Sequence, residues 1–173
     1  MMQQELMTLL GILDLMEQSE MKLAELYGTC AELWIKEDRF WRNMEQAETR
    51  HVGIVKRIKR IVSEKPDQFV LNRLFKIPAI RTMISGIQWN IQRLRKQEIN
   101  EHNMFFIARD LERSILETHY GQMVKSDDPA FQALMNEIVS DTRDHRDSLD
   151  QKISECSPAT LSKPEVHSKS QRR

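Results

Sequence analysis

The fold is decided by the stretch Met44-Glu45-Gln46-Ala47-Glu48-Thr49-Arg50-His51, in which Glu48 and His51 stand three residues apart within a helical apolar pattern. That spacing puts both side chains on one face of a helix. A carboxylate and an imidazole that face a core of isoleucine and valine lose their hydration and find no neutral partner there. A metal ion would supply the missing partner, so matching ligands are expected on other helices.

The segment before this stretch, from about Gln3 to Trp34, repeats apolar side chains alternately every three and four residues. Such spacing predicts a helix that buries one face in a bundle. Glu20 interrupts the apolar face about four turns from either end, where a charged side chain does not easily reach water. Glu20 is therefore a second candidate ligand.

Two further helices are predicted after the first. One begins at Asp38, which we expect to be its N-cap, and runs to about Ser63. The short connection between them predicts antiparallel neighbours. A long crossover, about residues 65–99, then follows, with a helix from about Ala79 to Gln97 whose apolar face carries no acid or histidine. We interpret that helix as structural.

The third bundle helix is predicted to start at a cap formed by Asn100 and to run to about Val124. Its inner face carries Glu112 and His119 among apolar residues. One acid therefore again stands in the middle of an apolar face.

The fourth bundle helix is predicted to start at Ser126-Asp127-Asp128-Pro129, a helix cap followed by proline in the first turn, and to run to about Ser154. Thr142 and His145 lie on its inner face, with Asp141 beside them. We therefore expect one helical domain over residues 1–155. Residues 156–173 contain prolines and serines without an apolar period, which predicts a disordered tail.

Composition narrows the range of functions. The 26 basic and 26 acidic residues cancel, so the electrostatic signature of a nucleic-acid-binding or membrane-surface protein is missing. No segment reads as an export signal or a membrane span. Cys30 and Cys156 form no CxxC pair, which excludes a rubredoxin-type iron site and favours a reducing compartment, the cytoplasm.

The chain contains an internal repeat. When the two halves are aligned on Glu20 and Glu112, His51 falls opposite His145. Each half therefore reads as a helical hairpin with an acid on its first helix and a histidine on its second. The repeat predicts the scaffold, although a duplicated scaffold by itself indicates no chemistry.

These residues resemble the ferritin-like, rubrerythrin-type di-metal carboxylate proteins, in which two helices supply one Glu each and two supply Glu-x-x-His. Glu20, with Tyr27 seven residues later, resembles the first-helix pattern. Glu48 and His51 resemble the Glu-x-x-His helix, and Glu112 fits the third helix. The resemblance covers roughly residues 5–154.

The resemblance implies an all-α fold, namely a ferritin-like antiparallel four-helix bundle with a long crossover that contains an extra helix. It also implies one or two metal ions, usually iron, that react with oxygen or peroxide or take part in iron oxidation and storage. The implied metal ligands are Glu20, Glu48, His51, Glu112 and His145, with Asp141, Asp144 and His119 as weaker candidates and Tyr27 in the second shell. No catalytic side chain is assigned.

The sequence departs from the family pattern at one position. Thr142 stands where the fourth glutamate would be, so the second half of the site is atypical. His145 then has no partner glutamate on its own helix. It is either a weaker ligand or is rescued by Asp141 or Asp144.

Several alternatives stay open from the sequence. Glu48 and His51 are either a metal-binding pair or a half-exposed pair at the bundle edge. Glu20 and Glu112 are either ligands or buried acids that hydrogen-bond to Tyr27 or to another partner. Carboxylate and imidazole ligands suit iron, manganese and zinc alike.

Two functions follow from these alternatives. One is a metal-binding protein with possible rubrerythrin-like non-haem iron oxidoreductase activity and a separate electron donor. The other is a non-enzymatic four-helix scaffold with a degraded metal site, acting in dimerisation or partner binding. A homodimer is expected in either case, with no nucleic-acid or membrane partner.

Overall fold

The computed structural model describes residues 3–71, 77–117 and 124–156. These residues are mostly helical, with one two-stranded sheet, so the prediction of an all-α protein is confirmed. The helices are α1 (Gln3–Leu33), α2 (Asp38–Glu64), α3 (Ile77–Arg95), α4 (Glu101–Glu117) and α5 (Pro129–Cys156). Two 3-10 turns, η1 (Ile35–Glu37) and η2 (Pro66–Gln68), and two strands, β1 (Val70–Leu71) and β2 (Val124–Lys125), lie in the connections.

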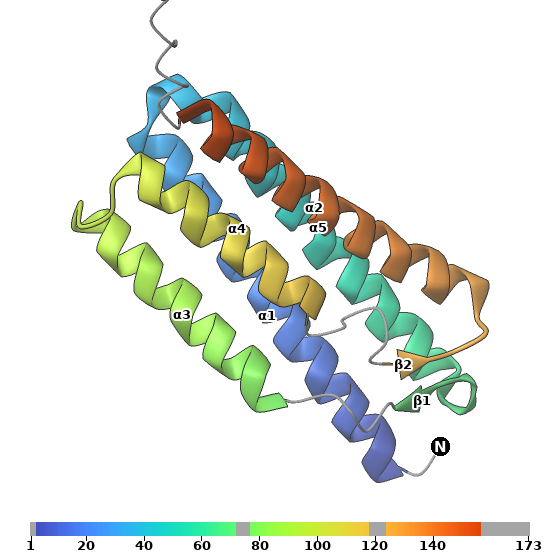
Figure 1. Ribbon diagram of the computed structural model, residues 1–173. Coiled ribbons are helices and arrows are strands. Elements are labelled where there is room, and N and C mark those ends of the chain that lie inside the picture. The colour runs from blue at the N-terminus through green and yellow to red at the C-terminus, as the bar shows by residue number, and fades with distance from the viewer. Residues whose placement is uncertain (1–2, 72–76, 118–123, 157–173) are drawn as a thin grey trace, which may run out of the picture.

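The helices lie side by side with alternating chain directions (Figure 1). α1 packs against α2, α4 packs against α5, and α2 also contacts α5. α3, the predicted crossover helix, packs on the outside of α1. The apolar face of α3 is therefore covered by the chain's own bundle, a point that the sequence left open.

Two helix starts agree with their predicted caps. The Asn103 backbone N–H donates a hydrogen bond to Asn100 Oδ1 at 2.8 Å, which makes Asn100 the N-cap of α4. Asp128 Oδ1 accepts hydrogen bonds from the backbone N–H groups of Ala130 and Phe131, both at 3.0 Å. Asp128 therefore caps α5, and Pro129 follows at the first helical position.

The predicted cap of α2 is wrong by one residue. Glu37 is the N-cap, without a side-chain capping bond, and Asp38 is the first helical residue. The 3-10 turn η1 leads directly into the helix, so the backbone at Asp38 is already helical. Its carboxylate accepts a hydrogen bond from Arg42 Nε at 3.3 Å. It also lies in the first turn, where a negative charge interacts favourably with the helix dipole.

The predicted end of the third bundle helix is also wrong. α4 is described as far as Glu117, and Val124 lies in strand β2 instead of the helix. Val124 pairs with Leu71, and Val70 pairs with Lys125, in an antiparallel arrangement. Strands of two residues are too short to show an alternating pattern, so no local signal predicts them.

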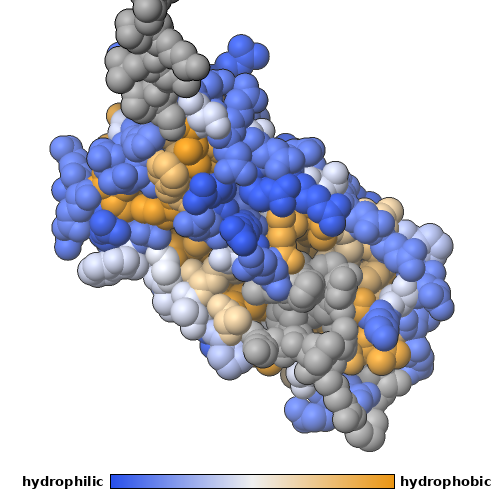
Figure 2. All heavy atoms as spheres, in the orientation of Figure 1, coloured by the Kyte–Doolittle hydropathy of each residue, from blue (hydrophilic) through white to orange (hydrophobic). Residues whose placement is uncertain are grey.

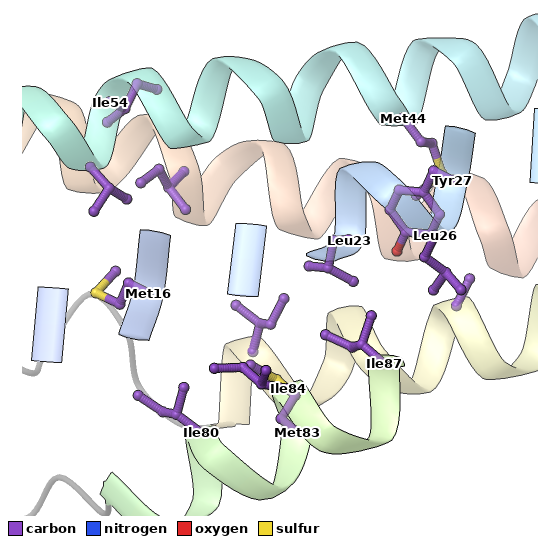
Figure 3. Close-up of a cluster of buried hydrophobic side chains, with 14 of the residues drawn as sticks. Met16, Leu23, Leu26, Tyr27, Met44, Ile54, Ile80, Met83, Ile84 and Ile87 are labelled. Atoms are coloured by element: carbon purple, nitrogen blue, oxygen red, sulfur yellow. The ribbon is translucent and has the colours of Figure 1, made fainter. Parts of the chain in front are cut away.

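The core between α1 and α3 is built from the predicted apolar faces. Ile80, Ile84 and Ile87 of α3 point toward α1, where Leu23 meets them (Figure 3). All of these side chains are buried. Burial of one such side chain contributes on the order of 1.5–3 kcal/mol. The crossover is thus held to the bundle by hydrophobic packing.

A close approach of α1 and α2 explains the glycine within the first helix. A Cβ atom on Gly28 would lie 2.8 Å from Glu45 Oε1. A side chain at position 28 would therefore crowd the Glu45 carboxylate of α2.

The surface is largely polar on the face in Figure 2, where hydrophilic side chains follow the helices. Among the described residues, no helix is long and apolar enough to cross a bilayer. The predicted disordered tail lies outside the described residues, apart from Cys156, which ends α5.

Candidate metal centre

Five of the sequence-predicted site residues meet in the interior between four helices. Glu20 comes from α1, Glu48 and His51 from α2, Glu112 from α4, and His145 from α5. The first four are at most 1% exposed, whereas the His145 side chain is 13% exposed. Ionisable groups are rarely buried without partners, so this concentration needs a physical explanation.

The first group consists of Glu20, Glu48 and His51. His51 Nδ1 lies 3.0 Å from Glu48 Oε2 and 3.5 Å from Glu20 Oε2. One ligand atom from each residue lies within 4.8 Å of the other two. The three-residue spacing on α2 brings Glu48 and His51 together, and the close packing of α1 adds Glu20.

The second group consists of Glu48, Glu112 and His145, and their ligand atoms also lie within 4.8 Å of one another. His145 Nδ1 is 2.9 Å from Glu48 Oε1 and 3.6 Å from Glu112 Oε1. Glu48 therefore presents one oxygen to each histidine. The two imidazole rings are 6.0 Å apart between centroids. A carboxylate between two such groups is placed to bridge two cations.

Several buried polar atoms of this cluster make no hydrogen bond within the described residues. They are Glu20 Oε1, Glu48 Oε1, Glu112 Oε2 and His145 Nδ1. Glu48 Oε1 and His145 Nδ1 belong to this set although they are only 2.9 Å apart, because their directions do not suit a hydrogen bond. Two ligands of one cation, each about 2.1 Å from it and at right angles, lie about 3.0 Å apart. The spacing fits two groups directed at a shared ion.

The histidines are held in the charged form by the surrounding carboxylates. Burial alone disfavours the imidazolium of His51, but its contacts with Glu20 and Glu48 outweigh burial and raise its pKa to about 11. His145 is affected in the same way by Glu112 and Glu48, which raise its pKa to about 10. In the metal-free protein, the protons on His51 and His145 therefore supply positive charge that a bound cation would otherwise supply.

The carboxylates respond unequally to the same environment. Burial raises the pKa of Glu20 to about 8, and burial together with the charge of Glu48 raises the pKa of Glu112. Burial also acts on Glu48, but its contacts with His145 and His51 lower its pKa below the ordinary range. Glu48 is thus the anion around which the metal-free cluster is arranged.

Tyr27 lies beside the second group. Its hydroxyl donates a hydrogen bond to Glu112 Oε1 at 2.5 Å, and its ring is fully buried. Burial and the charges of Glu112 and Glu48 raise the pKa of Tyr27 well above its usual value, so the hydroxyl keeps its proton. Tyr27 therefore fixes the orientation of Glu112, as expected of a residue that holds a metal ligand in place without binding the metal itself.

Thr142 is buried and brings no carboxylate to either group. Its hydroxyl donates a hydrogen bond to the Ile138 carbonyl oxygen at 2.8 Å, one turn back along α5. The residue three positions before His145 thus bonds to its own helix, whereas Glu48 contacts His51. The two halves of the cluster differ at this position.

Asp141 does not rescue the second group. Asp141 Oδ2 lies 3.2 Å from His51 Nε2 and accepts a hydrogen bond from Arg50 Nη2 at 3.3 Å. The two nitrogens of His51 therefore face carboxylates on opposite sides, with Asp141 on the side away from Glu48. A carboxylate in that place fixes the ring orientation of a histidine whose other nitrogen binds a metal.

This role of Asp141 was missed in the sequence, which indicated only its proximity to His145. Nothing in the sequence shows the offset between α2 and α5, so no signal linked Asp141 to His51. Of the other weaker candidates, Asp144 is exposed on α5 and belongs to neither group. His119 lies outside the described residues.

A groove between α2 and α5 leads to the cluster from the surface. Its cavity volume is about 350 Å³, and its walls include Arg50, Asp141, Asp144 and His145. His145 is the most exposed of the five cluster residues, and it forms part of this wall. His145 is therefore the member of the cluster nearest the exterior, whereas Glu48 and Glu112 of the same group are buried.

The donor set fits a metal ion. Carboxylate oxygens and imidazole nitrogens are the ligands of iron, manganese and zinc in proteins, and anionic side chains hold two such cations close together. The cluster offers three buried carboxylates and two imidazoles, and several of their atoms make no hydrogen bond within the described residues. The protein is thus helical and has buried Glu and His groups near enough to bind a metal ion.

Comparison of the chain with protein-family models, with curated proteins and with solved structures finds no match.

Proposed function

We propose that this chain is a ferritin-like metal-binding protein with a carboxylate and histidine centre in the core of its bundle. In this proposal α1, α2, α4 and α5 are the four bundle helices, and α3 belongs to the crossover; the packing of α1 on α2, of α4 on α5 and of α2 on α5 supports it. The observation that supports the proposal most strongly is the position of Glu48, whose two oxygens face His51 and His145 separately. Residues 1–155 would form this domain, followed by a tail.

The chain's residues would divide the work between two half-sites. Glu20, Glu48 and His51 would hold one ion, which we call the first half-site. Glu48, Glu112 and His145 would hold a second ion at the second half-site. Iron held by such ligands supplies oxidation chemistry toward oxygen or peroxide. The surrounding helices would keep bulk water from the first half-site, where the ligands are at most 1% exposed.

A rubrerythrin-like oxidoreductase would need electrons from another protein, because the sequence has no CxxC pair for a rubredoxin-type iron site. A separate electron donor is therefore part of the proposal. We also propose a homodimer and a location in the cytoplasm, on the basis of the sequence resemblance and the two free cysteines.

A second function, that of a scaffold with a degraded metal site, is favoured by Thr142, which supplies no ligand. Against it stand the buried oxygens of Glu20 and Glu112 that have no hydrogen bond within the described residues. A scaffold without a metal would gain from apolar residues at these positions, since buried unpaired polar atoms cost about 1–3 kcal/mol each. We therefore place the scaffold second.

Elemental analysis of untagged protein tests the proposal. The protein is incubated separately with ferrous iron, manganese and zinc in the absence of oxygen and is then passed through a desalting column. We expect at least one ion per chain, and no bound ion in the double variant Glu48→Ala/His51→Ala. If the folded wild-type protein holds none of the three metals, the proposed function is wrong.

Turnover is tested next on the ferrous protein. Consumption of oxygen or peroxide beyond the amount that oxidises the bound iron once, with an added reductant, would support an oxidoreductase. A single oxidation without turnover would instead support a passive metal-binding protein.

A further inference from the structure

The proposed centre has one negative charge too few for two divalent cations. Two such ions bring four positive charges, whereas Glu20, Glu48 and Glu112 supply three negative charges and the two histidines bind as neutral imidazoles. One positive charge would remain in the protein interior. An uncompensated buried charge is strongly unfavourable, so an additional anion is needed for the second ion to bind well.

We infer that the second half-site takes a small external carboxylate, of the size of formate or acetate, in place of the carboxylate that Thr142 lacks. This inference rests on the proposed function, because it requires a metal ion at the centre. It adds a ligand from outside the chain and explains how a site with three carboxylates holds two cations.

No described side chain near the centre is free to supply the missing charge. The Thr142 hydroxyl donates to the Ile138 carbonyl oxygen. The Asp141 carboxylate is engaged by His51 Nε2 and by Arg50. Asp144 is exposed and lies in the groove wall, outside both groups. The anion is therefore expected to come from solution.

The groove between α2 and α5 brings solvent to His145 and limits the size of an anion that approaches the second half-site from there. Its volume of about 350 Å³ accommodates a molecule of a few non-hydrogen atoms beside His145, a ligand of the second half-site. Glu112 Oε2 and His145 Nδ1, both of this half-site, have no hydrogen bond within the described part of the chain. These two atoms are buried, and His145, whose side chain is 13% exposed, connects their half-site to the groove.

The charges at the groove favour an anion with a single negative charge over one with several. Arg50 is 58% exposed and provides a positive charge, but Asp141 pairs with it. Asp144 adds a negative charge to the same wall. A multiply charged anion such as a phosphate ester would be repelled by the two aspartates, whereas a monoanion would be repelled less. Small carboxylates have the required charge and also reproduce the oxygen ligands of the missing glutamate.

Cobalt binding tests this inference without an activity assay. The protein is dialysed against excess Co²⁺ in a buffer free of carboxylates, once with sodium acetate and once with sodium perchlorate at the same ionic strength. Bound cobalt and the visible spectrum are measured. We expect about one tightly bound Co²⁺ per chain in perchlorate, rising toward two in acetate, with a spectral change that saturates as acetate increases.

Two variants of Thr142 serve as matched controls. Thr142→Glu supplies the carboxylate from the chain and is expected to hold two Co²⁺ in either salt, without a spectral response to acetate. Thr142→Val keeps the size of the side chain and removes a hydroxyl that is not a ligand, so its acetate response should equal that of the wild-type protein. The wild-type protein could already bind two Co²⁺ ions in perchlorate. In that case, a change of its cobalt spectrum with acetate that is absent from Thr142→Glu supports the inference.

The outcomes separate this inference from the proposed function. If wild-type protein binds no Co²⁺ in either salt, both are wrong. If it binds one or two Co²⁺ and neither the number nor the spectrum depends on acetate, the external carboxylate is wrong while the metal-binding function stands.

Discussion

The two half-sites share Glu48 and differ in how they are enclosed. The first half-site, with Glu20 and His51, is at most 1% exposed, and Asp141 supports the far side of His51. In the second half-site, Glu112 is fully buried, but the His145 side chain is 13% exposed and lines the groove between α2 and α5. The difference lies at His145, the one cluster side chain of the two groups that reaches the surface, so we expect a metal bound there to exchange more readily than one bound by Glu20 and His51.

The comparison also shows how the contacts differ where one half has a glutamate and the other a threonine. Glu48 on α2 and Thr142 on α5 occupy corresponding places three residues before a histidine. Glu48 contacts both histidines, whereas Thr142 bonds only to its own helix. The two halves are thus alike in the placement of their histidines and differ in charge three residues before them.

The largest effect is expected from removing the shared carboxylate. Glu48→Gln keeps the size of the side chain but removes the charge that faces both His51 and His145. We expect both half-sites to lose their metal, as measured by elemental analysis. The metal-free protein should also lose about 3–5 kcal/mol of stability in urea unfolding, because breaking a buried ion pair leaves charges unpaired.

A control for this variant is Glu64→Gln, which removes an acid from the exposed end of α2. Its metal content and stability should match the wild-type values. If Glu48→Gln binds metal as the wild-type protein does, Glu48 does not connect the two half-sites.

The next effect separates the two histidines. His51→Ala should abolish the tight site, because it removes a ligand of the first half-site. His145→Ala should leave that site intact and eliminate only the weaker one. Metal titration followed by equilibrium dialysis measures both variants. Equal losses of tightly bound metal in His51→Ala and His145→Ala would show that the half-sites do not differ in affinity as proposed.

A smaller effect is expected from Asp141→Asn. The change removes the charge that faces His51 Nε2 at 3.2 Å but leaves every ligand in place. The affinity of the first half-site should fall about 10–100-fold, which is typical when the support of a metal-bound histidine is lost. Asp144→Asn, on the same helix and exposed, should leave the affinity of the first half-site unchanged. A weaker second half-site with an unaltered first half-site would contradict the assignment of Asp141 to His51.

The last effect, which needs no substitution, is a change in metal stabilisation with pH. The pKa values of His51 and His145, about 11 and about 10 in the folded metal-free protein, exceed the ordinary 6.5. Their contribution to stability is therefore full below pH 6.5 and is lost as the pH rises through 10 and 11. Raising the pH thus weakens the metal-free fold and reduces competition between protons and metal.

Thermal unfolding with and without metal measures this linkage. The increase in Tm caused by metal should be larger at about pH 8.5 than at about pH 6, since each proton released on binding changes the apparent affinity about tenfold per pH unit. An increase in Tm that shrinks over this range would contradict the displacement of protons from His51 and His145 by metal.

Most of the helical framework could be predicted from sequence because it depends on local patterns. The apolar period placed the helices, and the caps at Asn100 and Asp128 marked two of their starts. Val124 was misplaced in a helix because its pairing with Leu71 depends on a segment far away in the sequence. Local signals carry no information about such a contact.

The same distinction applies to the candidate site. Glu48 and His51 stand out because a fixed spacing on one helix implies a shared face. The contact between Asp141 and His51 depends on the offset of α2 against α5, which packing determines. The groove beside His145 likewise depends on how α2 and α5 pack against each other, and no sequence pattern in either helix predicts it.

Anomalous X-ray diffraction from crystals grown with the bound metal tests the central claim most directly. The data are collected on both sides of the absorption edge of that metal. We predict a strong peak enclosed by Glu20, Glu48 and His51 and a second peak, of lower occupancy, beside Glu112 and His145. Crystals of metal-treated protein that show no peak among these residues, or a peak only at the surface, would contradict the claim.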